Sequence, residues 1–150
     1  MSEIENINKG QFIDIYSLTN LSELQRPMFP FGISAGFPSP ATDFIELSID
    51  LNKYLIKHPN STFFGRIKGE SMKDVGINDG DIVIIDKSID LINNKIAVCY
   101  IDGEFTLKRI EIEKNCVWLM PANENYSPIK VTEDNDLIVW GIVTYVIKAF

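Results

Sequence analysis

The sequence predicts a mainly β domain that carries one short helix and is preceded by an extended N-terminal arm. The first observation is a series of segments rich in β-branched and aromatic residues, which favour the pleated surface of a sheet. The second is that turns rich in Asn, Asp and Gly separate these segments. The third is a cluster of prolines in the first third of the chain, where helix and central strand are both disfavoured. We expect strands at residues 61–67, 81–88, 95–101, 104–113, 116–120, 127–132 and 137–150.

The arm is predicted from four prolines in the stretch RPMFPFGISAGFPSPA, at residues 26–41. Proline lacks an amide donor and pushes the preceding residue toward extended geometry, so this stretch is predicted to be an extended arm or linker. The residues before it include apolar side chains, from Phe12 to Leu24, that are too few for an independent domain. We therefore expect them to dock on another surface.

Local signals predict the helix and one hairpin turn. Asp50 can cap a short helix over residues 51–58, because its carboxylate accepts a hydrogen bond from a free amide of the first turn. Pro59 should stop that helix at the preceding residue. Asp102 and Gly103 stand between two strand-like segments and predict a two-residue hairpin, since this turn needs a positive φ that Gly supplies at low cost.

Composition narrows the class of protein. With 150 residues, 45% of them hydrophobic, the chain can bury a core as one domain. Its net charge of −7 argues against a general binder of the phosphate backbone. The N-terminal residues have no signal-peptide pattern and no apolar run is long enough to span a bilayer, so we expect a cytoplasmic protein without membrane contact.

The residues that could hold a metal or form a disulfide are few. Cys99 and Cys116 each lie in an apolar segment, and we expect both to be buried, reduced thiols. His58 is the only histidine and has no companion at metal-ligand spacing. We expect no metal and no cofactor.

Two residues remain as candidates for chemistry. Ser71 lies in the loop KGESM, two residues after Gly69, which could let another backbone approach closely, and adjacent amides in such a turn could stabilise an oxyanion. Lys108 lies within a predicted strand and shares a face with Thr106 and Ile110, and also with Ile112. Burial there would lower the pKa of its amine toward that of a general base. The alternatives are a turn-forming serine and a lysine whose amine reaches solvent.

Several motifs together carry a family resemblance. From Gly36 onward the chain resembles the LexA-like self-cleaving serine peptidases, and among them the UmuD-like accessory proteins of error-prone DNA synthesis in the bacterial SOS response. The motifs are GFPSPATDFIELSIDLNKYLIKHPNSTFF, GESM, GINDGDIVIID, DGEFTLKRI, MPANENYSPI and VWGIVTYVIKAF. The resemblance implies a catalytic β domain with Ser71 as nucleophile and Lys108 as general base. It also implies that backbone amides of Glu70 and Ser71 hold the oxyanion.

The same resemblance implies where the chain is cut. The family cleaves Ala-Gly or Cys-Gly bonds, and Ala35-Gly36 is the one Ala-Gly pair in this chain. Small residues let the backbone enter a narrow cleft, and the flanking prolines keep the arm extended. We therefore expect residues 1–35 to be an N-terminal arm removed on self-cleavage, and residues 36–150 to be the peptidase-like domain.

The resemblance further implies partners. It implies a homodimer, stimulation of cleavage by the RecA filament, and a UmuC-like Y-family DNA polymerase as the partner of the processed form. Only 35 residues precede Gly36 and no helix-turn-helix is readable, so direct sequence-specific DNA binding is not expected. Two alternatives stay open: a non-catalytic dimeric β module regulated by its arm, and a fragment of a LexA-like repressor.

Overall fold

Antiparallel strands are the main secondary structure. The computed structural model describes residues 4–10, 12–18, 22–28, 35–36 and 47–150. Its strands are β1 (Ile4–Lys9), β2 (Ile13–Leu18), β3 (Gln25–Met28), β4 (Leu47–Asp50), β5 (Thr62–Ile67), β6 (Ile82–Asp86), β7 (Ile96–Ile101), β8 (Glu104–Ile112), β9 (Val117–Met120), β10 (Ile129–Val131) and β11 (Leu137–Ile147).

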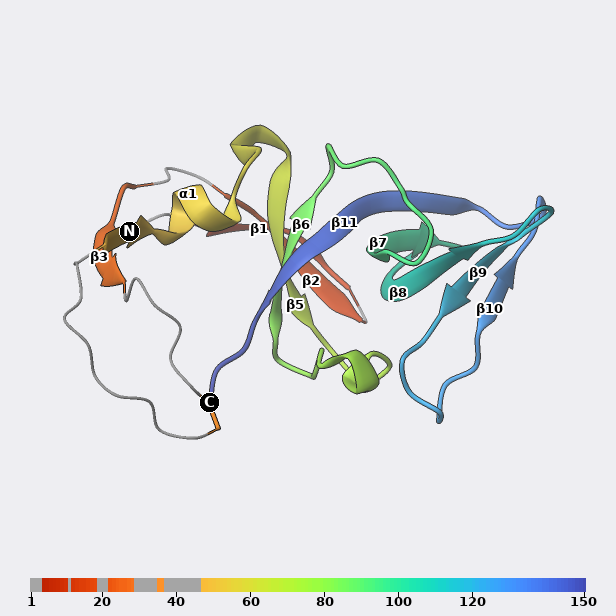
Figure 1. The fold of residues 1–150 in the computed structure, drawn as a ribbon. Helices are drawn as coiled ribbons and strands as arrows, with labels where there is room; N and C mark the ends of the chain where they lie inside the picture. Colours follow the sequence, from red (N-terminus) through yellow and green to blue (C-terminus); the bar gives the residue numbers. More distant parts are fainter. Residues whose placement is uncertain (1–3, 11, 19–21, 29–34, 37–46) are drawn as a thin grey trace.

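The strands form one large sheet and one small ribbon (Figure 1). The large sheet has nine strands in the order β1-β2-β5-β6-β11-β7-β8-β9-β10, and β3 pairs with β4 in a two-stranded ribbon. The predicted mainly β fold is confirmed, and a strand lies within each of the seven predicted segments. The predicted hairpin turn between β7 and β8 is also confirmed, because Asp102 and Gly103 both have positive φ, 47° and 88°.

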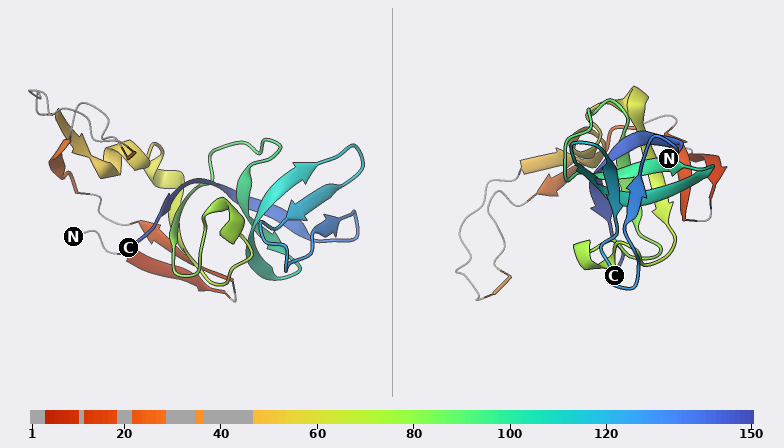
Figure 2. Two further views of the ribbon diagram at one scale, coloured as in Figure 1. Left: turned by 60° about the horizontal axis from the view of Figure 1, so that its bottom comes forward. Right: turned by 90° about the vertical axis from the view of Figure 1, so that its right-hand side faces the viewer.

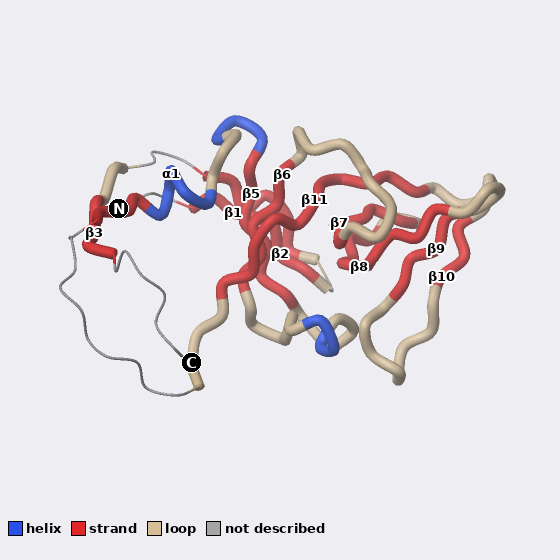
Figure 3. The backbone as a smooth tube through the Cα atoms, in the orientation of Figure 1, coloured by secondary structure: helices blue, strands red, loops and turns tan. Residues whose placement is uncertain are grey.

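Helical structure is limited to three short segments among the described residues (Figure 3). They are the α-helix α1 (Leu51–Leu55) and the 3₁₀ turns η1 (Pro59–Ser61) and η2 (Lys73–Val75). The Asp50 side chain accepts a hydrogen bond from the Asn52 amide at 3.0 Å, which confirms the predicted cap. The helix ends at Leu55 and not at residue 58 as predicted, because Ile56 already has extended backbone geometry. No helix in the described ranges is long and apolar enough to cross a membrane.

Strand β11 joins the two halves of the large sheet. Its first half pairs with β7 and its second half pairs with β6, so it crosses the middle of the molecule in Figure 1. The buried residues form two core clusters, and β7 contributes to both, with Val98 in one and Ala97 and Cys99 in the other. One consists of Ile13, Ile15, Ile67, Met72, Ile77, Val83, Ile85, Val98 and Leu107. The other consists of Ala97, Cys99, Ile101, Ile110, Leu119, Val131 and Ile142.

The N-terminal residues fold into a hairpin at the edge of the sheet, which the sequence did not predict as strands. Strand β2 pairs with β5, with Ile13 opposite Ile67 and Ser17 opposite Phe63. Ile13 and Ile15 are 0% and 1% exposed. The expected docking of this segment is therefore confirmed, and the hairpin lies alongside β5 in Figure 2.

A glycine in β5 makes room for that hairpin. A Cβ at Gly65 would lie 2.6 Å from Ile13 Cδ1 and 3.1 Å from Ile85 Cδ1, distances at which the neighbouring side chains have to shift. The missing side chain lets Ile13 pack directly over the strand. The absence of a side chain at Gly65 thus allows close packing between the N-terminal hairpin and the core.

The two cysteines differ in their surroundings. Both are free thiols. Cys99 is fully buried, as predicted, and burial raises the pKa of its thiol to about 12, against a smaller opposite effect of Lys108. The prediction of a buried thiol is wrong for Cys116, which is partly exposed because it lies just before β9, at the end of a hairpin.

We predict that strand β2 contributes directly to stability. Ile15→Ala should lower the free energy of unfolding by about 2–5 kcal/mol, because it removes a buried side chain and leaves a cavity. Leu24→Ala is the control, since Leu24 is 54% exposed and should change stability little. Urea unfolding followed by fluorescence measures both. Equal stability of the two variants would show that β2 does not belong to the core.

Candidate active site

Ser71 is held in a short loop that follows β5. Gly69 adopts a φ of +92°, a conformation that side chains other than Gly rarely allow, and its amide donates to Asp79 Oδ1 at 2.7 Å. Nothing lies within 4 Å of a Cβ at Gly69, so this glycine is needed for its backbone conformation and not for the close approach that we expected. Ser71 is followed by the 3₁₀ turn η2, whose C-cap Gly76 has a φ of 81°.

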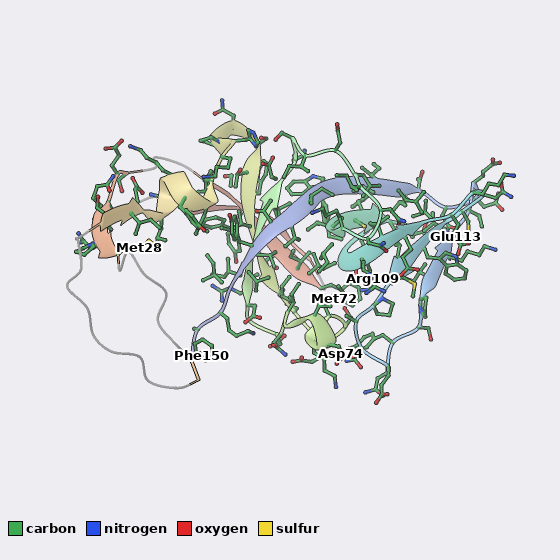
Figure 4. The ribbon with its side chains drawn as sticks, in the orientation of Figure 1. Met28, Met72, Asp74, Arg109, Glu113 and Phe150 are labelled. Atoms are coloured by element: carbon green, nitrogen blue, oxygen red, sulfur yellow. The ribbon has the colours of Figure 1, made fainter. Side chains whose placement is uncertain are left out.

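A second loop, between β9 and β10, fixes the Ser71 loop from the other side. The Ala122 amide donates to the Ser71 carbonyl at 2.7 Å, and the Asp74 amide donates to the Ala122 carbonyl at 2.8 Å. The buried Asn123 side chain donates to the Glu70 carbonyl at 2.8 Å. Met72, labelled with Asp74 in Figure 4, is buried in the first core cluster. The serine backbone is therefore restrained by both loops and by the core.

Asn123 is a positioning residue that the sequence did not reveal. Asn123 lies in the motif MPANENYSPI, in which no residue was assigned a role from the sequence, and its Oδ1 accepts from the Asn125 amide at 3.0 Å. Its second role depends on a contact with a loop 53 residues earlier. The only local signal was an Asn in a turn, where Asn is common because its side chain hydrogen-bonds to the nearby backbone.

Lys108 projects from β8 into the interior beside Ser71. It is 7% exposed and lies opposite Ala97 of β7. Its Nζ lies 3.1 Å from Ser71 Oγ, 3.0 Å from Thr106 Oγ1 and 3.0 Å from the Leu107 carbonyl oxygen. The structure thus brings the two predicted candidates into hydrogen-bond contact, although 37 positions separate them in the chain.

Burial sets the electrostatic state of this amine. It lowers the pKa of Lys108, because a charged ammonium is disfavoured away from water, and the nearby Cys99 opposes this only weakly. No carboxylate is among the three partners of Nζ. Of the residues expected on the same strand face, Thr106 and Ile110 are buried, whereas Ile112 is exposed at the end of β8. A desolvated amine next to a hydroxyl can act as its general base.

Ser71 and Lys108 line an open cleft of about 410 Å³. Its walls come from the turn of the N-terminal hairpin, the Ser71 loop, β8 and the segment before β10. The lining residues are Phe12, Lys68, Gly69, Glu70, Ser71, Ile101, Glu104, Thr106, Lys108, Tyr126, Ser127 and Ile129. Among the described residues, the amides of Glu70 and Ser71 donate to no backbone carbonyl outside the helices and strands.

The predicted cleavage residues lie outside this cleft. Ala35 and Gly36 are exposed and neither belongs to the cleft lining. Most of the proline-rich stretch around them lies outside the described residues. The structure therefore does not bring the Ala35-Gly36 bond to Ser71.

His58 is also remote from Ser71. It precedes β5, whereas Ser71 follows that strand, and the two chain segments lie at opposite ends of β5 in Figure 1. His58 Nδ1 instead lies 2.6 Å from Asp86 Oδ2. Burial acts to raise the pKa of Asp86, but hydrogen bonds from Ser88 and His58 outweigh it and lower that pKa. His58 belongs to this separate polar cluster.

Comparison with known proteins identifies the family. Residues 27–144 match the family described as Peptidase S24-like. The chain belongs to the S24 peptidase family. This S24 peptidase is 36% identical to the protein MucA of Salmonella typhimurium over 136 residues, which cover 89% of this chain and 92% of MucA.

Further relatives place the S24 peptidase within its family. It is 40% identical to the protein SamA of Salmonella typhimurium over 118 residues, which cover 79% of this chain and 81% of SamA. It is 37% identical to the LexA repressor of Ectopseudomonas mendocina over 117 residues, which cover 77% of this chain and 57% of that repressor. The resemblance to LexA-like and UmuD-like proteins is confirmed, and membership of this peptidase family implies a serine peptidase that acts on itself.

We predict that Lys108 makes stability depend on pH. Because its pKa is lowered from 10.5 in the folded protein, the unfolded chain binds more protons at pH values between the two pKa values. The cost of burying the ammonium is therefore present at low pH and is lost as the pH rises toward 10.5. Lys108→Met should stabilise the protein most at neutral pH, with a gain that shrinks as the pH rises.

The measurement is urea unfolding at several pH values from neutral to 10.5, the ordinary lysine pKa. Lys108→Met is compared with the unchanged Lys108 in a Ser71→Ala background, so that self-cleavage does not interfere. Lys114→Met provides the matched control for removal of a lysine side chain, because Lys114 is exposed. A pH-independent difference for Lys108→Met would contradict the lowered pKa.

Proposed function

We propose that this S24 peptidase cleaves its own Ala35-Gly36 bond with Ser71 as nucleophile and Lys108 as general base. The observation that carries the proposal is the 3.1 Å contact between Lys108 Nζ and Ser71 Oγ inside the cleft. The lowered pKa of Lys108 supports it, because only the neutral amine can accept the serine proton.

The proposed reaction follows from these positions. Neutral Lys108 takes the proton of the Ser71 hydroxyl as Oγ attacks the Ala35 carbonyl carbon. Backbone amides of Glu70 and Ser71 stabilise the oxyanion of the tetrahedral intermediate. Its collapse breaks the bond to Gly36, whose nitrogen receives the proton from Lys108. Lys108 then deprotonates a water that hydrolyses the acyl-enzyme, which frees Ser71 and leaves a carboxylate on Ala35.

The position of the cleavage bond supports a latent enzyme. Ala35 and Gly36 are exposed and absent from the cleft lining, so the segment that carries them has to move before Ser71 can attack. We propose that the RecA filament favours this movement, as the resemblance to UmuD-like proteins implies. The processed chain, residues 36–150, would then serve an error-prone polymerase of the UmuC-like Y family in the SOS response.

A homodimer is part of the same proposal. The second half of β11 pairs with β6 on one side, and among the described strands none pairs with residues 143–147 on the other side. Tyr145 and Ile147 on this segment are exposed apolar side chains. An unpaired strand edge with apolar side chains suits contact with a second copy of the chain.

We predict that Ser71→Ala abolishes self-cleavage and leaves the fold intact, because the hydroxyl is the nucleophile and contributes little to packing. The parent, incubated at alkaline pH, should yield one new N-terminus at Gly36. Ser48→Ala is the matched control, because Ser48 is exposed outside the cleft, and this variant should cleave at the parent rate. Intact-mass measurement follows cleavage of the parent and of both variants. Cleavage by Ser71→Ala at the parent rate would exclude Ser71 as nucleophile.

We predict that Lys108→Arg is inactive at every pH, because a guanidinium stays protonated and cannot accept the serine proton. In the parent, the cleavage rate should rise with pH and level off with a midpoint below 10.5, since burial lowers the pKa of Lys108. His58→Ala should keep the parent profile. An active Lys108→Arg together with an inactive His58→Ala would show that His58, and not Lys108, is the general base.

A further inference from the structure

We infer that, after the cut, the fragment of residues 1–35 stays bound to residues 36–150 as a separate chain that completes the sheet. The inference rests on the proposed cleavage for its biological setting. Its physical basis is that two strands before the cleavage bond are paired with strands after it. Cutting the chain between Ala35 and Gly36 breaks neither pairing.

The first connection is strand β2, which is an interior strand of the sheet. It lies between β1 and β5, so its backbone pairs on both sides. Ile13 and Ile15 belong to the first core cluster, whose remaining members all follow the cleavage bond. Loss of the fragment would therefore uncover part of this core and leave the edge of β5 unpaired, which is unfavourable in water.

The second connection is the ribbon of β3 and β4. Its register places Gln25 opposite Asp50 and Met28 opposite Leu47. Next to the ribbon, the Asn52 side chain donates to the Ser22 carbonyl at 2.7 Å, and the amine of Lys53 pairs with Glu23. Because the ribbon and the hairpin hold the fragment at separate places, one can remain paired while the other opens.

The third connection joins the fragment to the candidate active site. Lys68 Nζ lies 2.9 Å from Asp14 Oδ1 and 3.0 Å from the Gly10 carbonyl oxygen. The Lys68 amide donates to the Phe12 carbonyl at 2.8 Å, and Phe12 is part of the cleft wall. Lys68 lies just before the Ser71 loop, so the retained fragment keeps one wall of the cleft in place.

The inference has a consequence for interactions of the cut protein. While the fragment is bound, the edge of β5 is covered by a strand of the protein itself. A partner that adds a strand at β5 has to displace the fragment first. The occupant of this edge is thus the protein's own N-terminal segment.

The test compares two ways of making the same cut. In one sample the parent cleaves itself at alkaline pH and is returned to neutral pH. In the other, the Ser71→Ala chain carries a recognition sequence for a site-specific protease between Ala35 and Gly36 and is cut by that protease. Both samples are separated by size exclusion at low micromolar concentration and measured by native mass spectrometry. We expect one species that contains both fragments in each sample.

The outcomes separate the two proposals. If the parent does not cleave itself, the proposed function is wrong, and the protease-cut sample still tests the inference. If the peak of the protease-cut protein contains residues 36–150 alone, the inference is overturned whatever the parent does.

A pair of variants tests the cause of retention without changing residues 36–150. Ile13→Ala combined with Ile15→Ala should weaken binding of the fragment by on the order of tenfold or more, because two buried side chains are truncated. Leu24→Ala is the control within the same fragment, because Leu24 is exposed. Equal retention of the fragment in both variants would show that burial of β2 does not hold it.

Discussion

The candidate site depends on the removal of one lysine amine from water. The Lys108 side chain starts within a strand, and its amine lies among Ser71 Oγ, Thr106 Oγ1 and a backbone carbonyl, none of which is a carboxylate that would favour its charged form. This environment favours the neutral amine and so gives a lysine the property that a general base needs at moderate pH. The same burial lowers the free energy of unfolding, and packing in the rest of the sheet has to compensate for this loss.

Two separate structural elements set the geometry of this pair of residues. The tight turn at Asp102 and Gly103 fixes the register of β7 and β8, and so it fixes which strand residues face the interior. The Ser71 loop depends instead on contacts with the loop before β10, through Ala122 and Asn123. The serine and the lysine therefore stay in contact only while both the sheet register and the contact between loops are intact.

The sequence predicts the strands better than it predicts the site. Segments rich in β-branched residues and the Asp102-Gly103 turn carry local signals, and the structure has them where we expected. The hairpin of β1 and β2 carries a weak local signal, since the apolar alternation around Ile13 is short and its stability comes from pairing with β5. Proximity of Ser71 and Lys108 has no local signal at all, and only the family resemblance indicated it. Asn123 was missed for the same reason, because its partner lies in a distant loop.

The missing side chain at Gly65 offers a way to interpret other members of the family from sequence alone. Here a Cβ would meet Ile13 at 2.6 Å, so the N-terminal hairpin packs on β5 because position 65 is empty. A family member with Val or Leu at this position would fill the space that the end of the Ile13 side chain occupies here, so its residue at position 13 would need another rotamer or a smaller side chain. We therefore expect the residues at positions 13 and 65 to complement each other in size wherever an N-terminal strand packs over β5 as it does here.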